Sequence, residues 1–118
     1  MCGICGFAYA SSPAEAESHV RSMAAAMVHR GPDEDGFLIH DSRSPGTALG
    51  MRRLSIIDLS GGHQPVWNEA RDVAVVFNGE LYNYREVRQR LILAGHQFST
   101  NCDTEILAHG WEEWGESF

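Results

Sequence analysis

Hydrophobic and polar positions near the start of the chain follow first a strand pattern and then a helix pattern. Residues 2–10 are mostly small and apolar, and they predict a first strand. A helix start follows, because Ser12 and Glu15 have the spacing of a capping box and Pro13 suits the first helical position. The next apolar side chains recur at helical spacing and predict one buried helix face, formed by Val20, Met23, Ala24, Met27 and Val28.

The middle of the chain is predicted to alternate loops and strands. Proline and glycine interrupt residues 29–36 and 58–65, so both segments are expected to be loops. Short strands are predicted at residues 36–41 and 47–57. Residues 73–77 form a continuous apolar run, which is typical of a strand that is covered on both faces.

Two further amphipathic helices complete the prediction. One runs from about Tyr84 to Ala94, and its inward side is formed by Val87, Leu91 and Ala94. The other begins near Asp103 and has an apolar side formed by Leu107, Trp111 and Trp114, and the two tryptophans are expected to lie inward in the core. Strands flanked by such helices indicate a layered α+β or α/β architecture. No repeat or linker-like stretch interrupts the pattern, so residues 1–118 are expected to belong to one domain.

Composition and charge narrow the classes of function. The 118 residues are 43% apolar and 21% charged, as in an ordinary globular protein. The net charge of -7 argues against nucleic-acid and anionic-membrane partners. No apolar run approaches the roughly 20 residues of a membrane span, and no secretory leader is expected. All nine basic residues are arginine, which excludes a Walker A lysine and a Schiff-base lysine from this chain. Three cysteines, an odd number, do not suggest disulfides and favour the cytoplasm.

Cys2 is the most unusual position for chemistry. Cytosolic processing commonly removes Met1 when the next residue is as small as cysteine, and Cys2 would then carry a free α-amino group beside its thiol. An α-amino group has an ordinary pKa of roughly 7.7 to 8.0, so part of it is neutral at pH 7. It can accept the thiol proton, and a single residue then supplies both nucleophile and base.

A second interpretation pairs Cys2 with Cys5 as a redox or zinc half-site. Side chains three positions apart on a strand point to opposite faces, which disfavours it. Cys102 and the six histidines supply neither a second cysteine pair nor two histidines at zinc-ligand spacing, so no metal site is expected. Cys5 is better explained as a small core residue.

Asn78 and Gly79 directly follow the predicted strand 73–77. The simpler interpretation of this pair is a tight hairpin turn. The functional interpretation is an oxyanion hole, because a side-chain amide and an adjacent backbone N–H at a strand end can both donate to a developing oxyanion.

Arg53 and Asp103 are charged residues within elements that are predicted to be structured. A half-hidden guanidinium on a strand would bind a carboxylate, either a structural partner such as Asp33 or Asp58 or a carboxylate of a substrate. Asp103 at a helix start would cap the helix, interact with its dipole, or receive an ammonium group. The structural role is the default for both.

Several motifs occur together in one order along the chain. They are Met1-Cys2-Gly3-Ile4, His29-Arg30-Gly31-Pro32-Asp33, Arg53-Leu54-Ser55-Ile56-Ile57-Asp58, Gln64-Pro65, Asn78-Gly79-Glu80-Leu81-Tyr82-Asn83 and Asp103-Thr104-Glu105. This order and spacing resemble the class II glutamine amidotransferase domain, an N-terminal-nucleophile (Ntn) glutaminase, of glutamine-hydrolysing asparagine synthetases. The resemblance covers essentially the whole chain.

The resemblance implies a reaction centred on Cys2. After removal of Met1, its thiol would attack the side-chain amide of glutamine, and Asn78 with the Gly79 N–H would hold the oxyanion. Ammonia would leave first, and water would then hydrolyse the γ-glutamyl thioester to glutamate.

Substrate recognition is implied for other matching residues. Arg53 would bind the α-carboxylate of glutamine and Asp103 its α-ammonium group. Further contacts are implied for Leu54, Ser55, Ile56, Ile57 and Glu80. The loop at residues 29–33 would support the site rather than take part in catalysis.

The resemblance also implies a fold and partners. The family fold is an Ntn-hydrolase-like, four-layer α-β-β-α sandwich, and this α+β chain would supply only its first part, truncated at its C-terminal end. The synthetase domain would be absent; ATP and Mg²⁺ belong to that domain, and no cofactor is expected in this chain. The implied partners are L-glutamine, the synthetase domain and possibly a second copy in a homodimer.

Besides the missing C-terminal part, a second departure from the family and two alternatives accompany this interpretation. Cys102 stands where the family often has serine, a mild change that keeps a small side chain. The chain could instead be a non-catalytic module, truncated or with Met1 retained. It could also be a glutaminase domain that serves an acceptor other than aspartate.

Overall fold

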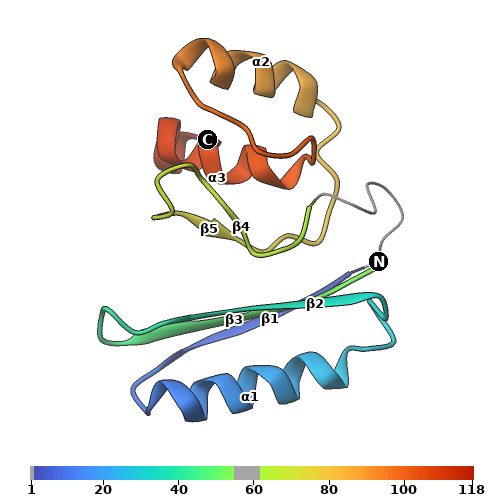
Figure 1. Cartoon of the computed structure of the whole chain (residues 1–118), viewed down its shortest axis with the longest axis vertical. Helices are drawn as coiled ribbons and strands as arrows, with labels where there is room; N and C mark the ends of the chain where they lie inside the picture. The colour runs from blue at the N-terminus through green and yellow to red at the C-terminus, as the bar shows by residue number, and fades with distance from the viewer. Residues whose placement is uncertain (1, 55–61) are drawn as a thin grey trace.

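The computed structural model describes residues 2–54 and 62–118 of this chain. In chain order the elements are β1 (Gly3–Tyr9), α1 (Pro13–Ala26), β2 (Glu34–His40), β3 (Gly46–Arg53), β4 (Val66–Trp67), β5 (Ala74–Val75), α2 (Tyr84–Ala94), α3 (Thr104–Trp114) and a short 3₁₀ turn, η1 (Gly115–Ser117). Figure 1 shows them stacked from bottom to top as α1, the sheet β1–β3–β2, the β4–β5 hairpin, and α3 with α2.

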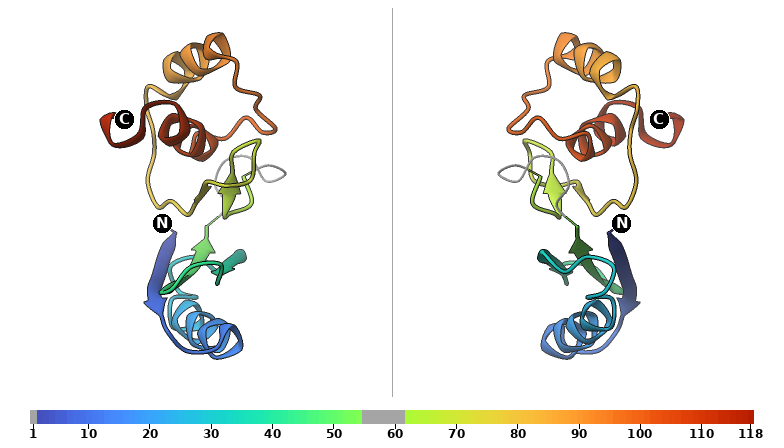
Figure 2. Two further views of the ribbon diagram at one scale, coloured as in Figure 1. Left: turned by 90° about the vertical axis from the view of Figure 1, so that its left-hand side faces the viewer. Right: turned by 90° about the vertical axis from the view of Figure 1, so that its right-hand side faces the viewer.

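The first part of the chain is a helix packed on an antiparallel sheet. The strand order is β1-β3-β2, so β3 is central and pairs with both neighbours. Helix α1 covers one face of this sheet, as all views show (Figure 2). Their shared core is formed by Tyr9, Ala16, Val20 and Ala48, with Cys5, Phe7, Phe37 and Ile39 packed around it.

The predicted first strand and first helix are confirmed, with one correction to the helix face. The strands predicted at residues 36–41 and 47–57 are observed as β2 and β3, but β2 begins inside the predicted loop 29–36 and β3 ends at Arg53. Ser12 accepts from Glu15 N and Glu15 Oε2 accepts from Ser12 N, so the capping box is present. The buried stripe consists of Ala16, Val20 and Ala24. Met23 and Val28, which were predicted to be inward, are 40% and 42% exposed. A narrow stripe at i, i+4 and i+8 is sufficient because the helix lies close to the small residues of β3.

The other face of the sheet is less covered. Ile4, Gly6 and Ala8 are exposed there, and Leu38 and Leu49 are half-buried. Among the residues described, no helix or strand of this first part packs against a helix or strand of the second part. The described chain is therefore a mixed α and β protein with antiparallel sheets, and the four-layer sandwich is not observed in it.

The second part contains a two-stranded hairpin and two helices. Helix α3 packs against α2 and against both β4 and β5. The prediction for residues 73–77, a strand covered on both faces, is wrong in two respects. Only Ala74 and Val75 form a strand, and the whole run is half-buried. Its partner β4 was not predicted, since a two-residue strand leaves no periodic pattern in the sequence.

Helix α2 has its predicted bounds, but Ala94 is exposed and only Leu91 is buried. Helix α3 also begins where predicted, but its buried residues are Thr104, Glu105, Ile106, Ala108, His109 and Gly110. Trp111, predicted to be inward, is 50% exposed. The predicted apolar side borders a hollow of about 340 Å³ lined by Val73, Ala74, Val75, Leu107, Trp111 and Phe118.

Loops connect the two parts. A Cβ atom on Gly36 of β2 would overlap the carbonyl oxygen of Gln64, so the backbones approach closely there. The side chain of Gln64 in turn accepts from Phe77 N at 2.6 Å and donates to Phe77 O at 3.2 Å. The segment that precedes Asn78 is thereby held to the same loop.

No helix in the described ranges is long and apolar enough to cross a membrane.

The capping box predicts a measurable contribution to stability. Ser12→Ala removes the acceptor for Glu15 N and is expected to lower the free energy of unfolding by about 1 kcal/mol, measured by urea denaturation. Ser11→Ala, at the exposed neighbouring position, is the control and should leave the urea midpoint unchanged. Equal losses in both variants would contradict a specific role for the cap.

Candidate active site

The register between β1 and β3 determines where the N-terminal cysteine lies. Gly3 pairs with Arg52, and continuing this register by one residue places Cys2 across from Arg53. Figure 1 shows the N-terminus beside the end of β3, between the two parts of the molecule. Successive strand residues point to opposite faces, so both side chains are assigned to the face away from α1.

Cys5 lies on the opposite face and belongs to the core. Its thiol packs beside α1, with Sγ 3.9 Å from the Val20 carbonyl oxygen. Burial raises the pKa of Cys5 above its ordinary value, although the Gly50 backbone lowers it in part. The prediction of Cys5 as a core residue is confirmed, and the strand alternation separates it from Cys2 as a metal or redox pair.

Arg53 is a buried cation at the end of β3, only 8% exposed. Its Nη1 lies 3.2 Å from Oε2 of Glu34, the residue across from it in β2. The same carboxylate oxygen lies 3.0 Å from His63 Nδ1. Glu34 was not among the partners expected from the sequence, because cross-strand register cannot be derived without knowing which strands pair.

The loop at residues 29–33 is fixed beside Arg53 by the neighbouring arginine. Arg52 Nε donates to the Gly31 carbonyl at 2.8 Å and Nη2 donates to the Pro32 carbonyl at 3.2 Å. A Cβ atom on Gly31 would overlap the backbone carbonyl group of Arg52, so only glycine allows this approach. These contacts agree with a supporting role for the loop.

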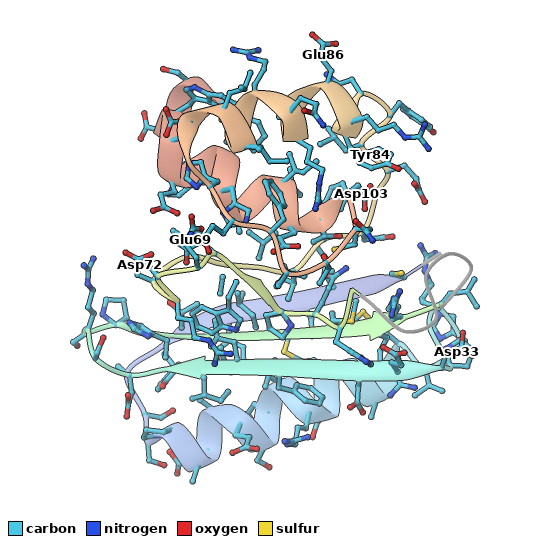
Figure 3. The ribbon with its side chains drawn as sticks, turned by 45° about the horizontal axis from the view of Figure 1, so that its top comes forward. Asp33, Glu69, Asp72, Tyr84, Glu86 and Asp103 are labelled. Carbon is cyan, nitrogen blue, oxygen red and sulfur yellow. The ribbon has the colours of Figure 1, made fainter. Side chains whose placement is uncertain are left out.

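Asp103 occupies the N-cap position of α3, but its side chain does not cap the helix. Instead, Oδ2 accepts from the backbone N–H of Leu81 at 2.8 Å. The prediction of a side-chain cap is therefore wrong, while the predicted interaction with the helix dipole stays a prediction. The carboxylate joins the start of α3 to the segment that contains Asn78, Gly79 and Glu80. Figure 3 shows Asp103 at this end of α3.

Asn78, Gly79 and Glu80 are exposed in the structure. The hairpin-turn interpretation of Asn78-Gly79 is wrong, because neither residue has the positive φ of a type I′ turn and no strand follows them. A Cβ atom on Gly79 would lie 2.6 Å from the Phe77 ring, so this backbone passes close to an aromatic side chain.

Gly62 lies between the side chain of Arg53 and the loop before α3. It adopts φ = 84°, and a Cβ atom placed on it would lie 3.3 Å from Cys102 Cβ and 3.4 Å from Arg53 Nη2. The Arg53 guanidinium and Cys102, the neighbour of Asp103, are thus separated by little more than one glycine.

Leu54 follows directly after β3 and is half-buried, while Ser55, Ile56 and Ile57 lie outside the described residues.

Glu105 fixes the loop that carries Asp103. Its buried carboxylate accepts from the backbone N–H groups of Ser99 and Thr100 at 2.7 and 2.8 Å and from both hydroxyl groups. Burial acts to raise the pKa of Glu105, but these hydrogen bonds, led by the Thr100 hydroxyl, lower it below its ordinary value. No role was predicted for this residue, although it belongs to the Asp103-Thr104-Glu105 motif.

The arrangement combines three groups that suit an amino-acid substrate. A thiol at the start of the chain, a buried guanidinium and a carboxylate beside an exposed backbone segment can together meet an electrophilic carbonyl, a carboxylate and an ammonium group.

The chain is also similar to known proteins. A family model described as "Glutamine amidotransferase domain" matches residues 1–118, so the chain belongs to this family of domains. It is 40% identical over 98% of its length to asparagine synthetase [glutamine-hydrolyzing] 1 of Bacillus subtilis (strain 168), of which it covers 18%. It is also 40% identical over its whole length to the corresponding enzyme of Sandersonia aurantiaca, covering 22%. For the nodule enzyme of Pisum sativum these values are 37%, the whole chain and 19%. The chain thus spans about a fifth of the length of these relatives.

The hydrogen bonds of Glu105 predict that even a conservative substitution of this residue lowers the stability of the fold. Glu105→Gln offers an amide in place of a carboxylate to four donors, so it is expected to lower the free energy of unfolding by at least about 2 kcal/mol. Urea denaturation measures the change. Glu116→Gln, at an exposed position near the end of the chain, is the matched control and should be neutral; a neutral Glu105→Gln would contradict the assigned role.

Proposed function

We propose that this chain is the glutaminase part of a glutamine-hydrolysing asparagine synthetase. The observation that carries this proposal is the β1–β3 register, which assigns Cys2 and the buried Arg53 to the same face at the end of the sheet. A nucleophile beside a fixed cation suits a substrate whose reactive amide and carboxylate belong to one small molecule. The family match over the whole chain supports the same assignment.

In the proposed reaction Cys2 is both nucleophile and base. Once Met1 has been removed, the α-amino group accepts the thiol proton and the sulfur attacks the side-chain carbonyl carbon of glutamine. Asn78 and the Gly79 N–H stabilise the oxyanion of the tetrahedral intermediate. The α-ammonium group then protonates the leaving nitrogen, ammonia departs, and a γ-glutamyl thioester forms. Water adds to the thioester, glutamate leaves, and the thiol is regenerated.

Specificity for glutamine is assigned to two charged residues. Arg53 binds the α-carboxylate and Asp103 the α-ammonium group. An analogue that lacks either group would leave one of these charged side chains without its partner, so it would bind more weakly. Glu34 already lies 3.2 Å from Arg53 Nη1, so the substrate carboxylate would share the guanidinium with it. Leu54, Ser55, Ile56, Ile57 and Glu80 are proposed as further substrate contacts.

The proposal extends to a longer protein. The partly exposed sheet face with Ile4 and the hollow beside Trp111 are surfaces that the remaining layers of a four-layer α-β-β-α sandwich would cover. A synthetase domain outside this chain would bind ATP and Mg²⁺ and transfer the ammonia to activated aspartate. A second copy of the chain, in a homodimer, is a further proposed partner. A cytoplasmic setting suits the free thiols at Cys2, Cys5 and Cys102.

Covalent labelling tests the nucleophile. A diazo-ketone analogue of glutamine is expected to add one equivalent to the purified protein, and intact-mass analysis also reports whether Met1 is absent. Cys2→Ala should abolish labelling. Cys5→Ala and Cys102→Ala are matched controls and should retain it, because Cys5 is packed against α1 and neither residue is the proposed nucleophile. Retained Met1 together with unlabelled protein would support the non-catalytic module instead.

Substrate discrimination tests the carboxylate clamp. Glutamine should be preferred over its α-carboxamide analogue by about 100-fold in kcat/KM, the effect of losing one charged hydrogen-bonding group. Arg53→Lys should raise KM for glutamine and reduce this preference, because lysine lacks the bidentate fork. Arg21→Lys, at an exposed position on α1, should change neither value. An unchanged preference in Arg53→Lys would assign the carboxylate to another residue.

A further inference from the structure

A cluster of two histidines and two glutamates lies away from the proposed active site. Glu69 lies in the turn between β4 and β5, His96 in the connection from α2 to α3, and His109 and Glu112 on α3. One ligand atom from each of the four residues can be chosen so that all lie within 4.8 Å of one another. Figure 3 shows Glu69 in its turn beside Asp72, on the side of α3 away from Asp103.

The imidazole of His109 is the central feature of this cluster. The side chain is fully buried, and within the described residues its Nδ1 has no hydrogen-bond partner. Glu69 Oε2 lies only 2.6 Å from Nδ1, so the contact is close but does not have the direction of an N–H hydrogen bond. A buried ring nitrogen that faces a carboxylate without a hydrogen bond is a polar group that still needs a partner, and a bound cation would supply one.

The other members present donors with suitable separations. His96 Nδ1 lies 3.1 Å from Glu69 Oε1 and 3.8 Å from Glu112 Oε2. In a tetrahedral zinc site, ligands about 2.1 Å from the ion lie roughly 3.4 Å from each other. These two separations lie on either side of this value. The 2.6 Å between His109 Nδ1 and Glu69 Oε2 is shorter, so these two groups would have to move apart to bind the ion. His109 and Glu112 are three residues apart on α3 and therefore share one helix face.

Each histidine also has a carboxylate at its second ring nitrogen. His109 Nε2 lies 3.5 Å from Oε1 of the buried Glu105, and His96 Nε2 lies 3.2 Å from Glu113 Oε2. A carboxylate at this position can accept a proton from Nε2, and that tautomer is the one in which Nδ1 can bind a metal. Four carboxylates surround two imidazoles, so a divalent cation would offset an excess of negative charge.

From these contacts we propose that Glu69, His96, His109 and Glu112 form a structural zinc site. Two imidazole nitrogens and two carboxylate oxygens form a complete four-ligand set for Zn²⁺, with no position left for a substrate. The ion would join the β4–β5 turn, the α2–α3 connection and α3 at one point. This site was not expected from the sequence, where cysteines and closely spaced histidines were the only signals considered.

Zinc binding by the intact chain tests the proposal without reference to enzyme activity. The protein is stripped with a chelator and then titrated with Zn²⁺ alone, followed by calorimetry, elemental analysis and thermal unfolding. We expect one ion per chain and a rise in Tm with zinc concentration, because a ligand bound only by the folded state stabilises it. Co²⁺ in place of zinc should give the visible absorption of a tetrahedral site.

Variants at the exposed ligands distinguish a zinc site from a network of ion pairs. Glu69→Gln and Glu112→Gln change partly exposed side chains and should retain the fold, yet each should weaken zinc binding by about 100-fold or more. Glu116→Gln is the matched control, and Cys2→Ala should bind zinc like the unchanged protein. Absence of saturable binding, or equal binding by Glu69→Gln, Glu112→Gln and the control, would show that the cluster holds ion pairs only.

Discussion

The antiparallel pairing of β3 with both β1 and β2 is the constraint on which the proposed active site depends. A slip of one residue in either register would turn every side chain to the opposite face. In the observed register Cys5 packs against α1, while Cys2 is assigned to the face away from it. The second register places Glu34 across from Arg53, so the guanidinium is neutralised and held in one direction. The proposed nucleophile and the cation therefore need no further element to bring them together.

The sequence predicts local structure well where one short-range signal determines it. The capping box at Ser12 and the bounds of α2 are confirmed, because each depends on residues within a few positions of one another. Burial is predicted less well. The run at residues 73–77 was expected to be covered on both faces, and Trp111 was expected to be inward, yet the first is half-buried and the second is half exposed. Hydrophobicity shows that a residue favours burial, but which surface covers it depends on the rest of the fold.

The candidate site shows the same division. The motifs around Cys2, Arg53 and Asp103 are visible in the sequence because they resemble a known family, and the family match confirms that membership. Contacts between residues distant in sequence are not visible there. Which strands and loops become neighbours decides three such contacts. They are the pairing of Glu34 with Arg53, the hydrogen bond from Leu81 to Asp103, and the position of Gly62 between Arg53 and Cys102. For Ser55, Ile56 and Ile57 the assignment still depends on the sequence alone.

Helix α3 links the two sites through an unusual choice of buried face. It places Glu105 and His109 inside and leaves Trp111 half exposed, which would be costly if the polar groups lacked partners. The carboxylate of Glu105 provides partners on two sides. It accepts hydrogen bonds from Ser99 and Thr100, and it also faces His109 Nε2. The first set of contacts fixes the loop that carries Asp103, and the second orients a proposed zinc ligand. A cation bound at His109 would therefore restrain the same helix whose start carries Asp103.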